Sequence, residues 1–544
     1  VVVRELDLTT STFIGDGFTL PEAKTSIGWI DADTLLVSTN LAPATRTQSG
    51  YARQLRRWRR GEPFERSEVL FECAESDMGT WFSVCRAPGR EHIAIHRVID
   101  FFNREVTVLR AGRAPQRLDI PADCEPQIHG DRLVMTLKSD WAPAGETLAA
   151  GSVLITSLSG LLDGQREFTC LFKPTLRSSV QSLMATRTTV VLNVLDNVRS
   201  QVLIACQADG GRWRVEPLEG LPAGTTLTAM GFEADGEPST DDFLVVATGF
   251  LTPPTLFLAG GGRELHELRR APSHFDPAGL TVTQHEAVSS DGELVPYFEV
   301  ARADAPADGS RPTLIEAYGG FEVSLLPVYD ATAGKLWLER GGVLVVANLR
   351  GGGELGPRWH EAGRRAGKRQ SHDDLAAVAR DITRRGISRP DRIAAIGGSN
   401  GGLLVASMLT RYPESFGAIV CGVPLIDMRR YTRLPPGASW IAEYGDPDNP
   451  DDWAFMQSFS PYQQLPSGRP YPPILIHTST RDDRVHPGHA RKFAARLKAL
   501  GYAPYFFENE DGGHAGAADH EAVARRIALE HAFLRRSLGM GGAT

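Results

Sequence analysis

Apolar and polar positions change their pattern once along the chain, close to residue 275. Before that point the apolar residues form short runs separated by turn-forming residues, which indicates many short strands and almost no helices. These runs lie at 34–38, 92–96, 105–109, 132–136, 152–155, 190–194, 202–204 and 243–247. So many strands exceed one sandwich, and a β-propeller of roughly 40–50 residues per blade fits the pattern best.

From residue 312 onward, apolar runs typical of buried strands alternate with amphipathic runs typical of helices. After a hairpin at 288–297, the expected strands lie at 313–317, 343–347, 392–396, 418–421, 473–477 and 504–507. The clearest helical patterns lie at 372–385, 402–411 and 489–500. This alternation predicts a mostly parallel sheet with helices on both faces, whose active site lies at the carboxyl ends of the strands.

Composition supports two domains and excludes several functions. A chain of 544 residues is too long for one ordinary core, and 42% hydrophobic with 23% charged residues is typical of a soluble globular protein. A net charge of −8 does not favour nucleic-acid binding, and no apolar run is long enough for a membrane span. The six cysteines lack metal-ligand spacing. We therefore expect thiols in a reducing compartment, a cytoplasmic location, and neither metal nor cofactor.

The strand expected at 392–396 runs into the sequence Gly397-Gly398-Ser399-Asn400-Gly401, after which a helical pattern begins. A serine in such a strand–turn–helix corner is typical of the nucleophile elbow of α/β-hydrolases. The glycines have a physical reason, because larger side chains on either side of the serine would collide with the neighbouring strand and helix. The alternative is a plain glycine-rich turn with a serine N-cap, so the surrounding motifs must decide.

An activated serine needs a base, and the base needs an orienting carboxylate. In this type of fold they follow the serine in the order acid, then histidine. The apolar run 474–477 leads into Asp482 and Asp483, and the run 505–507 leads into a glycine-rich loop with His514. The pattern alone does not choose between the two aspartates.

Other histidines after the serine fit a catalytic role less well. His477 lies within an expected strand and is interpreted as a core residue, and His520 falls on the last helix. His486 and His489 begin a helix, where capping or surface positions are expected. His514 therefore remains the candidate base.

Acyl transfer also needs donors for the developing oxyanion. The backbone N–H of Asn400, which follows the serine, is one candidate. The second should come from the loop after the first parallel strand, Tyr318-Gly319-Gly320-Phe321. Taken by itself, that loop reads better as a tight Gly-Gly turn.

Together these motifs resemble the prolyl oligopeptidase family of serine peptidases, over about residue 288 to the end of the chain. The motifs that carry the resemblance are Tyr318–Phe321, Ala347–Gly356, Gly397–Val405, Trp440–Gly445, Asp482–Val485 and Gly513-His514. The resemblance implies an N-terminal β-propeller and a C-terminal α/β-hydrolase domain. We place them at residues 1–275 and 276–544.

The resemblance also implies roles. Ser399 is similar to the nucleophile, His514 to the base and Asp482 to the orienting acid. The Tyr318 hydroxyl resembles a side-chain oxyanion donor beside the Asn400 amide, and Arg484 resembles the arginine that holds a substrate carbonyl.

The resemblance further implies a pocket for a proline ring. Four of its members match the family: Phe321, Trp440, Tyr444 and Val485. The fifth member, Leu425, lies where the family often has valine. A flat indole stacks well on a rigid pyrrolidine ring. Glu443, the one acid within the pocket motif, is expected to face away.

About 275 residues precede the hydrolase domain, enough for five or six blades. Members of the family usually have seven blades and a leading segment. We therefore expect an incomplete propeller with an exposed edge or an open ring.

The leading hypothesis is a serine endopeptidase that cleaves short proline-containing peptides after proline through an acyl-enzyme. An esterase or acylaminoacyl-type exopeptidase on the same scaffold, and a non-catalytic propeller binding module, are the alternatives. Neither the oligomeric state nor the natural peptide can be read from the sequence.

Overall fold

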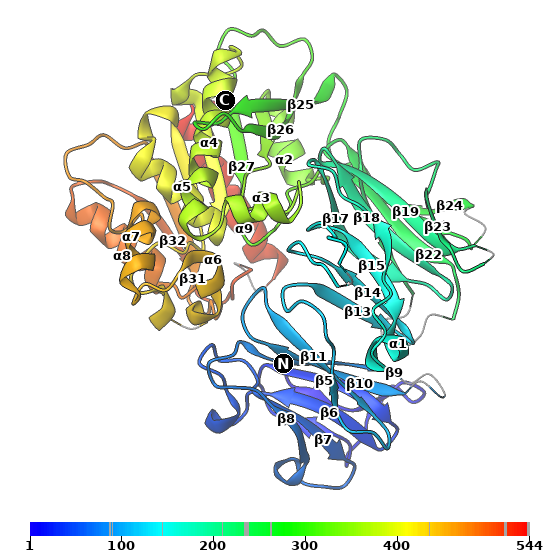
Figure 1. The fold of residues 1–544 in the computed structure, drawn as a ribbon. Helices are drawn as coiled ribbons and strands as arrows, with labels where there is room; N and C mark the ends of the chain where they lie inside the picture. The colour runs from blue at the N-terminus through cyan, green and yellow to red at the C-terminus, as the bar shows by residue number, and fades with distance from the viewer. Residues whose placement is uncertain are drawn as a thin grey trace.

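A computed structural model of the chain describes residues 1–85, 89, 91–143, 145–208, 210–232, 239–261, 264–434, 436–515 and 519–540. Figure 1 shows a β-rich part, coloured blue to green, that curves along one side of an α/β part. The change between the two lies where the hydrophobic pattern changes, because the last strand of the β-rich part ends at Arg270 and the α/β sheet begins at Leu280.

The β-rich part contains, within the described ranges, five four-stranded antiparallel sheets, each a meander in chain order. This is the arrangement of propeller blades, and five is within the range that the length predicted. The sheets consist of β5 (Thr25–Asp31), β6 (Thr34–Thr39), β7 (Gln54–Arg59) and β8 (Glu68–Glu72); β9 (Gly79–Cys85), β10 (His92–Val98), β11 (Arg104–Arg110) and β12 (Gln116–Arg117); β13 (Glu125–His129), β14 (Arg132–Thr136), β15 (Val153–Ser157) and β16 (Thr169–Phe172); β17 (Ser178–Ala185), β18 (Thr189–Asp196), β19 (Arg199–Gln207) and β20 (Trp213–Pro217); β21 (Thr226–Met230), β22 (Phe243–Gly249), β23 (Thr252–Ala259) and β24 (Leu265–Arg270).

Shorter elements accompany these sheets. Two small hairpin-like pairs precede them, and one short helix, which the sequence did not predict, follows β15. They are β1 (Val3–Arg4) with β4 (Thr19–Leu20), β2 (Leu6–Asp7) with β3 (Thr12–Phe13), and α1 (Leu158–Leu162). Ser157 caps α1 by accepting a hydrogen bond from the Gly160 N–H.

The α/β part is built on one eight-stranded sheet in the order β25-β26-β28-β27-β29-β30-β31-β32. The hairpin β25–β26 joins β28 antiparallel, and all later pairs are parallel. The strands are β25 (Leu280–Val288), β26 (Leu294–Arg302), β27 (Thr313–Ala317), β28 (Val343–Ala347), β29 (Ile393–Gly398), β30 (Ala418–Gly422), β31 (Ile474–Ser479) and β32 (Tyr505–Asn509).

Helices cover both faces of this sheet, as the alternating pattern predicted (Figure 1). The helices are α2 (Ala331–Leu336), α3 (Pro357–Ala362), α4 (Lys368–Arg384), α5 (Asn400–Arg411), α6 (Ile441–Tyr444), α7 (Pro450–Met456), α8 (Gly488–Ala499) and α9 (His520–Ser537). Successive strand residues point to opposite faces: Ile315 packs in the cluster that includes residues of α4, α5 and α8, and Leu314 in the cluster with α9. In the described part of the chain, no helix combines the length and apolar character needed to cross a membrane.

Candidate active site

Ser399 lies between the central strand β29 and helix α5, at φ 59° and ψ −116°. A non-glycine residue in this region is strained by about 1–3 kcal/mol, and such strain persists only where the surroundings enforce it. A Cβ on Gly397 would lie 2.4 Å from the Gly401 oxygen, and one on Gly401 would lie 2.9 Å from the Ala317 oxygen. The flanking glycines are therefore required sterically, which is the reason that the sequence suggested.

Asp482 and His514 follow the neighbouring strands β31 and β32, at the same edge of the sheet as Ser399. The structure brings them together: His514 Nδ1 lies 2.8 Å from Asp482 Oδ2 and 3.1 Å from Oδ1. Asp482 is buried, and its Oδ1 also accepts hydrogen bonds from the backbone N–H groups of Arg484 and Val485. A buried, fixed carboxylate on Nδ1 can hold the imidazole with Nε2 directed toward a reacting group.

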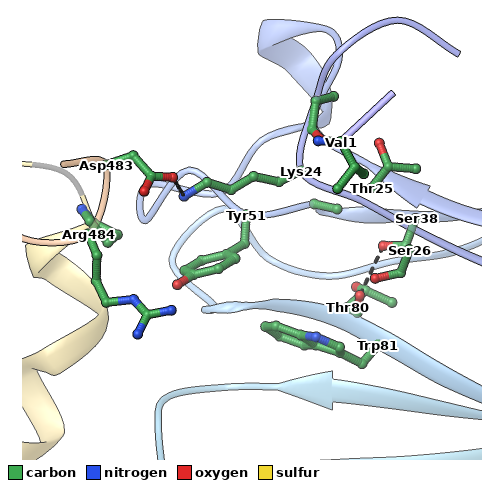
Figure 2. A pocket seen from close by; sticks show the side chains of 13 residues that line it. Val1, Lys24, Thr25, Ser26, Ser38, Tyr51, Thr80, Trp81, Asp483 and Arg484 are labelled. Atoms are coloured by element: carbon green, nitrogen blue, oxygen red, sulfur yellow. Dashed lines mark hydrogen bonds and ion pairs between the residues drawn. The ribbon is translucent and has the colours of Figure 1, made fainter. Parts of the chain in front are cut away.

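The side chains of Asp483 and Arg484 extend from the α/β domain toward the propeller (Figure 2). The Asp483 carboxylate is 71% exposed and pairs with Lys24 of the propeller at 3.5 Å. Tyr51, on the propeller side, faces the exposed Arg484 across a cleft of about 370 Å³. The two adjacent aspartates thus have different partners, and only Asp482 contacts the histidine.

Tyr318 follows β27 and is half-buried, with its side chain close to that of Ser399. Burial raises the pKa of Tyr318 to about 12, although the nearby Ser399 side chain acts in the opposite direction. The hydroxyl is therefore protonated at neutral pH and can donate to an oxyanion formed at Ser399.

The Asn400 side chain ties two of the predicted site residues together. Its Nδ2 donates to the Tyr318 carbonyl oxygen at 2.6 Å, and its Oδ1 accepts from the Tyr444 hydroxyl at 2.8 Å. The sequence singled out only the backbone amide of Asn400. The structure adds a side chain that joins the Tyr318 loop to Tyr444.

The predicted pocket residues share one apolar cluster beside the serine. Phe321 is packed against the buried members, and Tyr444 meets its ring edge-on at 5.5 Å between centroids. The Leu425 N–H lies 3.4 Å from the Ser399 carbonyl oxygen, so the residue that departs from the family pattern lies directly beside the elbow. The predicted members of the cluster are Phe321, Leu425, Trp440, Tyr444 and Val485.

Glu443 was expected to face away from the pocket, and its carboxylate has partners of its own in the interior. It is wholly buried, and Oε1 accepts a hydrogen bond from the Phe321 N–H at 3.1 Å. Lys368 Nζ lies 2.8 Å from Oε1, and His360 Nε2 lies 2.8 Å from Oε2. Burial pushes the pKa of Glu443 upward, but Lys368 and His360 together outweigh that effect and lower it. The carboxylate is therefore a neutralised anion behind the Phe321 backbone.

Sequence reasoning missed this buried cluster. Lys368 also donates to the Gly319 carbonyl oxygen at 3.0 Å, so it supports the Tyr318–Phe321 loop from beneath. Lysine on an amphipathic helix is normally read as a surface residue. The only available signal was an acid, Glu443, inside an otherwise apolar motif.

The glycines at 351 and 353, quoted above only as part of a family motif, have a steric role. A Cβ on Gly351 would lie 2.6 Å from the Gly319 oxygen, and one on Gly353 would lie 2.3 Å from the Glu322 oxygen. The loop that carries Tyr318 can pack here only against a bare backbone.

The histidine assignments hold with one correction. His477 is buried and pairs with Glu530 at 3.0 Å, as expected of a core residue, and His486 is exposed. His489 is not a surface residue: it is buried, and its Nδ1 accepts a hydrogen bond from the Asp427 N–H. Within the described ranges, no three His, Cys, Asp or Glu side chains group as metal ligands.

Known proteins resemble the chain over its whole length. The Peptidase_S9 model, described as the prolyl oligopeptidase family, matches residues 329–541. An uncharacterized peptidase, y4nA, of Sinorhizobium fredii (strain NBRC 101917 / NGR234) is 38% identical over 547 residues, covering 99% of this chain and 74% of that protein.

Solved and curated proteolytic enzymes are similar as well. The structure of a post-proline cleaving enzyme from Rickettsia typhi is 31% identical with a TM-score of 0.93, covering 99% of this chain and 80% of the other. A prolyl endopeptidase of Elizabethkingia meningoseptica is 34% identical over 317 residues, which are 57% of this chain and 44% of that protein.

Asp482→Asn should lower kcat for a chromogenic peptide by about 10³–10⁴-fold, because an amide on His514 Nδ1 favours the wrong tautomer. Asp483→Asn, the matched control, removes only an exposed pair with Lys24 and should leave kcat within about twofold. Steady-state kinetics of both variants check this. A crippled Asp483 variant beside an active Asp482 variant would reverse the assignment.

Tyr318→Phe should lower kcat/KM by about 10²–10³-fold, because one oxyanion donor is lost while the ring still packs. Since the pKa of Tyr318 is raised to about 12, the wild-type hydroxyl should remain a donor throughout the neutral and mildly alkaline range. Kinetics combined with fluorophosphonate labelling of Ser399 check the prediction. An unchanged kcat/KM would place the second donor elsewhere.

Proposed function

Because the chain belongs to the prolyl oligopeptidase family of serine peptidases, we propose that it cleaves short peptides after proline through an acyl-enzyme on Ser399. In this proposal residues 1–275 form the propeller domain and residues 276–544 the catalytic domain. The observation that carries the specificity is the apolar, aromatic cluster beside Ser399, behind which Glu443 is already paired with Lys368.

In the proposed first half-reaction, Ser399 Oγ attacks the carbonyl carbon of the proline residue, and His514 Nε2 takes the hydroxyl proton. Asp482, on Nδ1, holds the tautomer and stabilises the imidazolium. The oxyanion accepts hydrogen bonds from the Tyr318 hydroxyl and the Asn400 N–H. His514 then gives its proton to the leaving amine, and the C–N bond breaks to leave an ester on Ser399.

In the second half-reaction a water molecule attacks the ester carbonyl, and His514 takes its proton. The same two donors hold the second oxyanion, and the proton returns to Ser399 Oγ as the ester bond breaks. The products are a peptide that ends in proline and a regenerated serine.

The pocket supports proline over charged side chains. A pyrrolidine ring packed against the cluster of Phe321, Trp440 and Tyr444 would bury its carbons without leaving a polar group unpaired. A lysine or arginine side chain would find no unpaired carboxylate there, because Glu443 lies behind the wall and is held by Lys368 and His360.

The position between the domains supports a preference for short peptides. Phe101 of the propeller packs edge-on against Phe321 at 5.0 Å between centroids, so the propeller borders the pocket directly. Arg484, exposed in the cleft between the domains, can donate to a carbonyl of the residue before proline.

We predict that N-blocked Gly-Pro p-nitroanilide is cleaved with a kcat/KM at least about 100-fold above the Gly-Ala and Gly-Arg analogues, because only proline fills the pocket. Initial rates on the three substrates and on a p-nitrophenyl ester measure this. Ser399→Ala should abolish turnover of all of them, which shows that the activity belongs to this site.

Two results would contradict the proposal. Ester hydrolysis without peptide cleavage would favour an esterase. Retention of more than about a hundredth of the wild-type rate by the Ser399→Ala variant would remove the nucleophile assignment.

A further inference from the structure

The pocket residue Phe321 and the residue after it, Glu322, have a strained backbone. Phe321 and Glu322 have φ values of 55° and 57°, in the left-handed region that non-glycine side chains rarely adopt. A strained turn of this kind must be held by its surroundings. Its ring-bearing residue, Phe321, is the wall of the proposed proline pocket.

The catalytic domain holds the backbone of this turn and packs the Phe321 ring against Tyr444. The Phe321 N–H donates to Glu443, and the Glu322 N–H donates to the Gly351 carbonyl oxygen at 3.0 Å. Neither bond fixes the Glu322 side chain.

The propeller holds the Glu322 side chain and also contacts the Phe321 ring. Lys138, just after β14, places its Nζ 2.8 Å from Glu322 Oε2 and 3.2 Å from Glu125 Oε1. The Lys138 and Glu322 side chains are 20% and 19% exposed, so solvent screens their pair only partly. Phe101 of the propeller packs edge-on against the Phe321 ring.

We propose that Lys138 is a positioning residue for specificity: its ammonium group holds Glu322 and thereby sets the Phe321 wall of the proline pocket. The pocket is then complete only while the propeller is docked on the catalytic domain. This inference rests on the proposed post-proline activity and assigns part of that specificity to the other domain.

A second ion pair across the same cleft offers a matched control. Arg358 and Lys138 both line a cleft of about 470 Å³ between the domains. Arg358 lies 3.8 Å from Asp140 of the propeller, but the side chains are 67% and 52% exposed and neither is part of the strained turn. Replacing Arg358 therefore tests the effect of weaker domain docking while the contacts of Phe321 and Glu322 stay intact.

The experiment measures kcat/KM for N-blocked Gly-Pro and Gly-Gly p-nitroanilides with Lys138→Met, Lys138→Arg, Glu322→Gln, the Met/Gln double variant and Arg358→Met. Glycine at the cleaved position has no side chain to contact Phe321. The kcat/KM of the glycine substrate therefore measures catalysis without the contribution of the Phe321 wall. Thermal unfolding confirms that each variant is folded.

Lys138→Met should lower kcat/KM for the proline substrate about tenfold and for the glycine substrate less than about twofold, because the wall and not the triad is displaced. Lys138→Arg should restore most of the proline-to-glycine ratio. The double variant should lose no more than the more impaired single variant, since both remove the same contact. Arg358→Met should leave the ratio unchanged.

The inference is overturned if Lys138→Met leaves the proline-to-glycine ratio of kcat/KM unchanged or lowers kcat/KM equally for both substrates. It is also overturned if the fold losses of Lys138→Met and Glu322→Gln multiply in the double variant. Failure of the proposed function looks different, because wild type itself would then show no preference for proline. In that case the residue that wild type prefers replaces proline in the ratio, and the same comparison tests Lys138.

Discussion

The backbone of Ser399 is the constraint on which the rest of the site depends. A left-handed serine at the junction of β29 and α5 is possible only because glycines surround it, and a Cβ at position 397 would lie 2.4 Å from the Gly401 oxygen. The strained turn places the Ser399 hydroxyl at the carboxyl edge of the sheet, where the loops after β27, β31 and β32 also end. Tyr318, Asp482 and His514 reach the serine region from those three loops.

A buried ion pair supports the loop on the other side of the serine. Burying Glu443 and Lys368 costs several kcal/mol per ion, and removing one partner of such a pair typically costs about 3–5 kcal/mol. Here both charges also bind backbone: Glu443 accepts from the Phe321 N–H, and Lys368 donates to the Gly319 oxygen. The pair thus fixes both ends of the loop segment from Gly319 to Phe321, which joins the proposed oxyanion donor to the proposed pocket wall. It leaves no unpaired charge facing the pocket.

The sequence predicted the architecture because its periodicities follow from backbone geometry. The strands at 132–136, 313–317 and 343–347 end where the pattern places them, and the order of serine, acid and histidine follows from the sheet. Helix α4 begins at Lys368, four residues before the predicted start, because its first turn carries the buried lysine and does not show an apolar stripe.

Tertiary contacts account for what could not be predicted. The choice between Asp482 and Asp483 depends on which carboxylate the loop buries, and the buried partners of Glu443 lie at least 75 positions away along the chain. No sequence pattern predicted a role for Lys138, because its partner Glu322 lies 184 residues away and in the other domain.

The central claim is that the Tyr318 hydroxyl, the Asn400 amide and the aromatic pocket together recognise a proline acyl group on Ser399. A crystal structure of the protein with a phosphonate inhibitor that carries proline at the reacting position tests it most directly. The account predicts a phosphonyl oxygen about 2.7–3.1 Å from both Tyr318 Oη and the Asn400 nitrogen, with the pyrrolidine ring packed against Trp440 and Phe321. A phosphonyl oxygen that meets neither donor, or a proline ring outside this cluster, would contradict it.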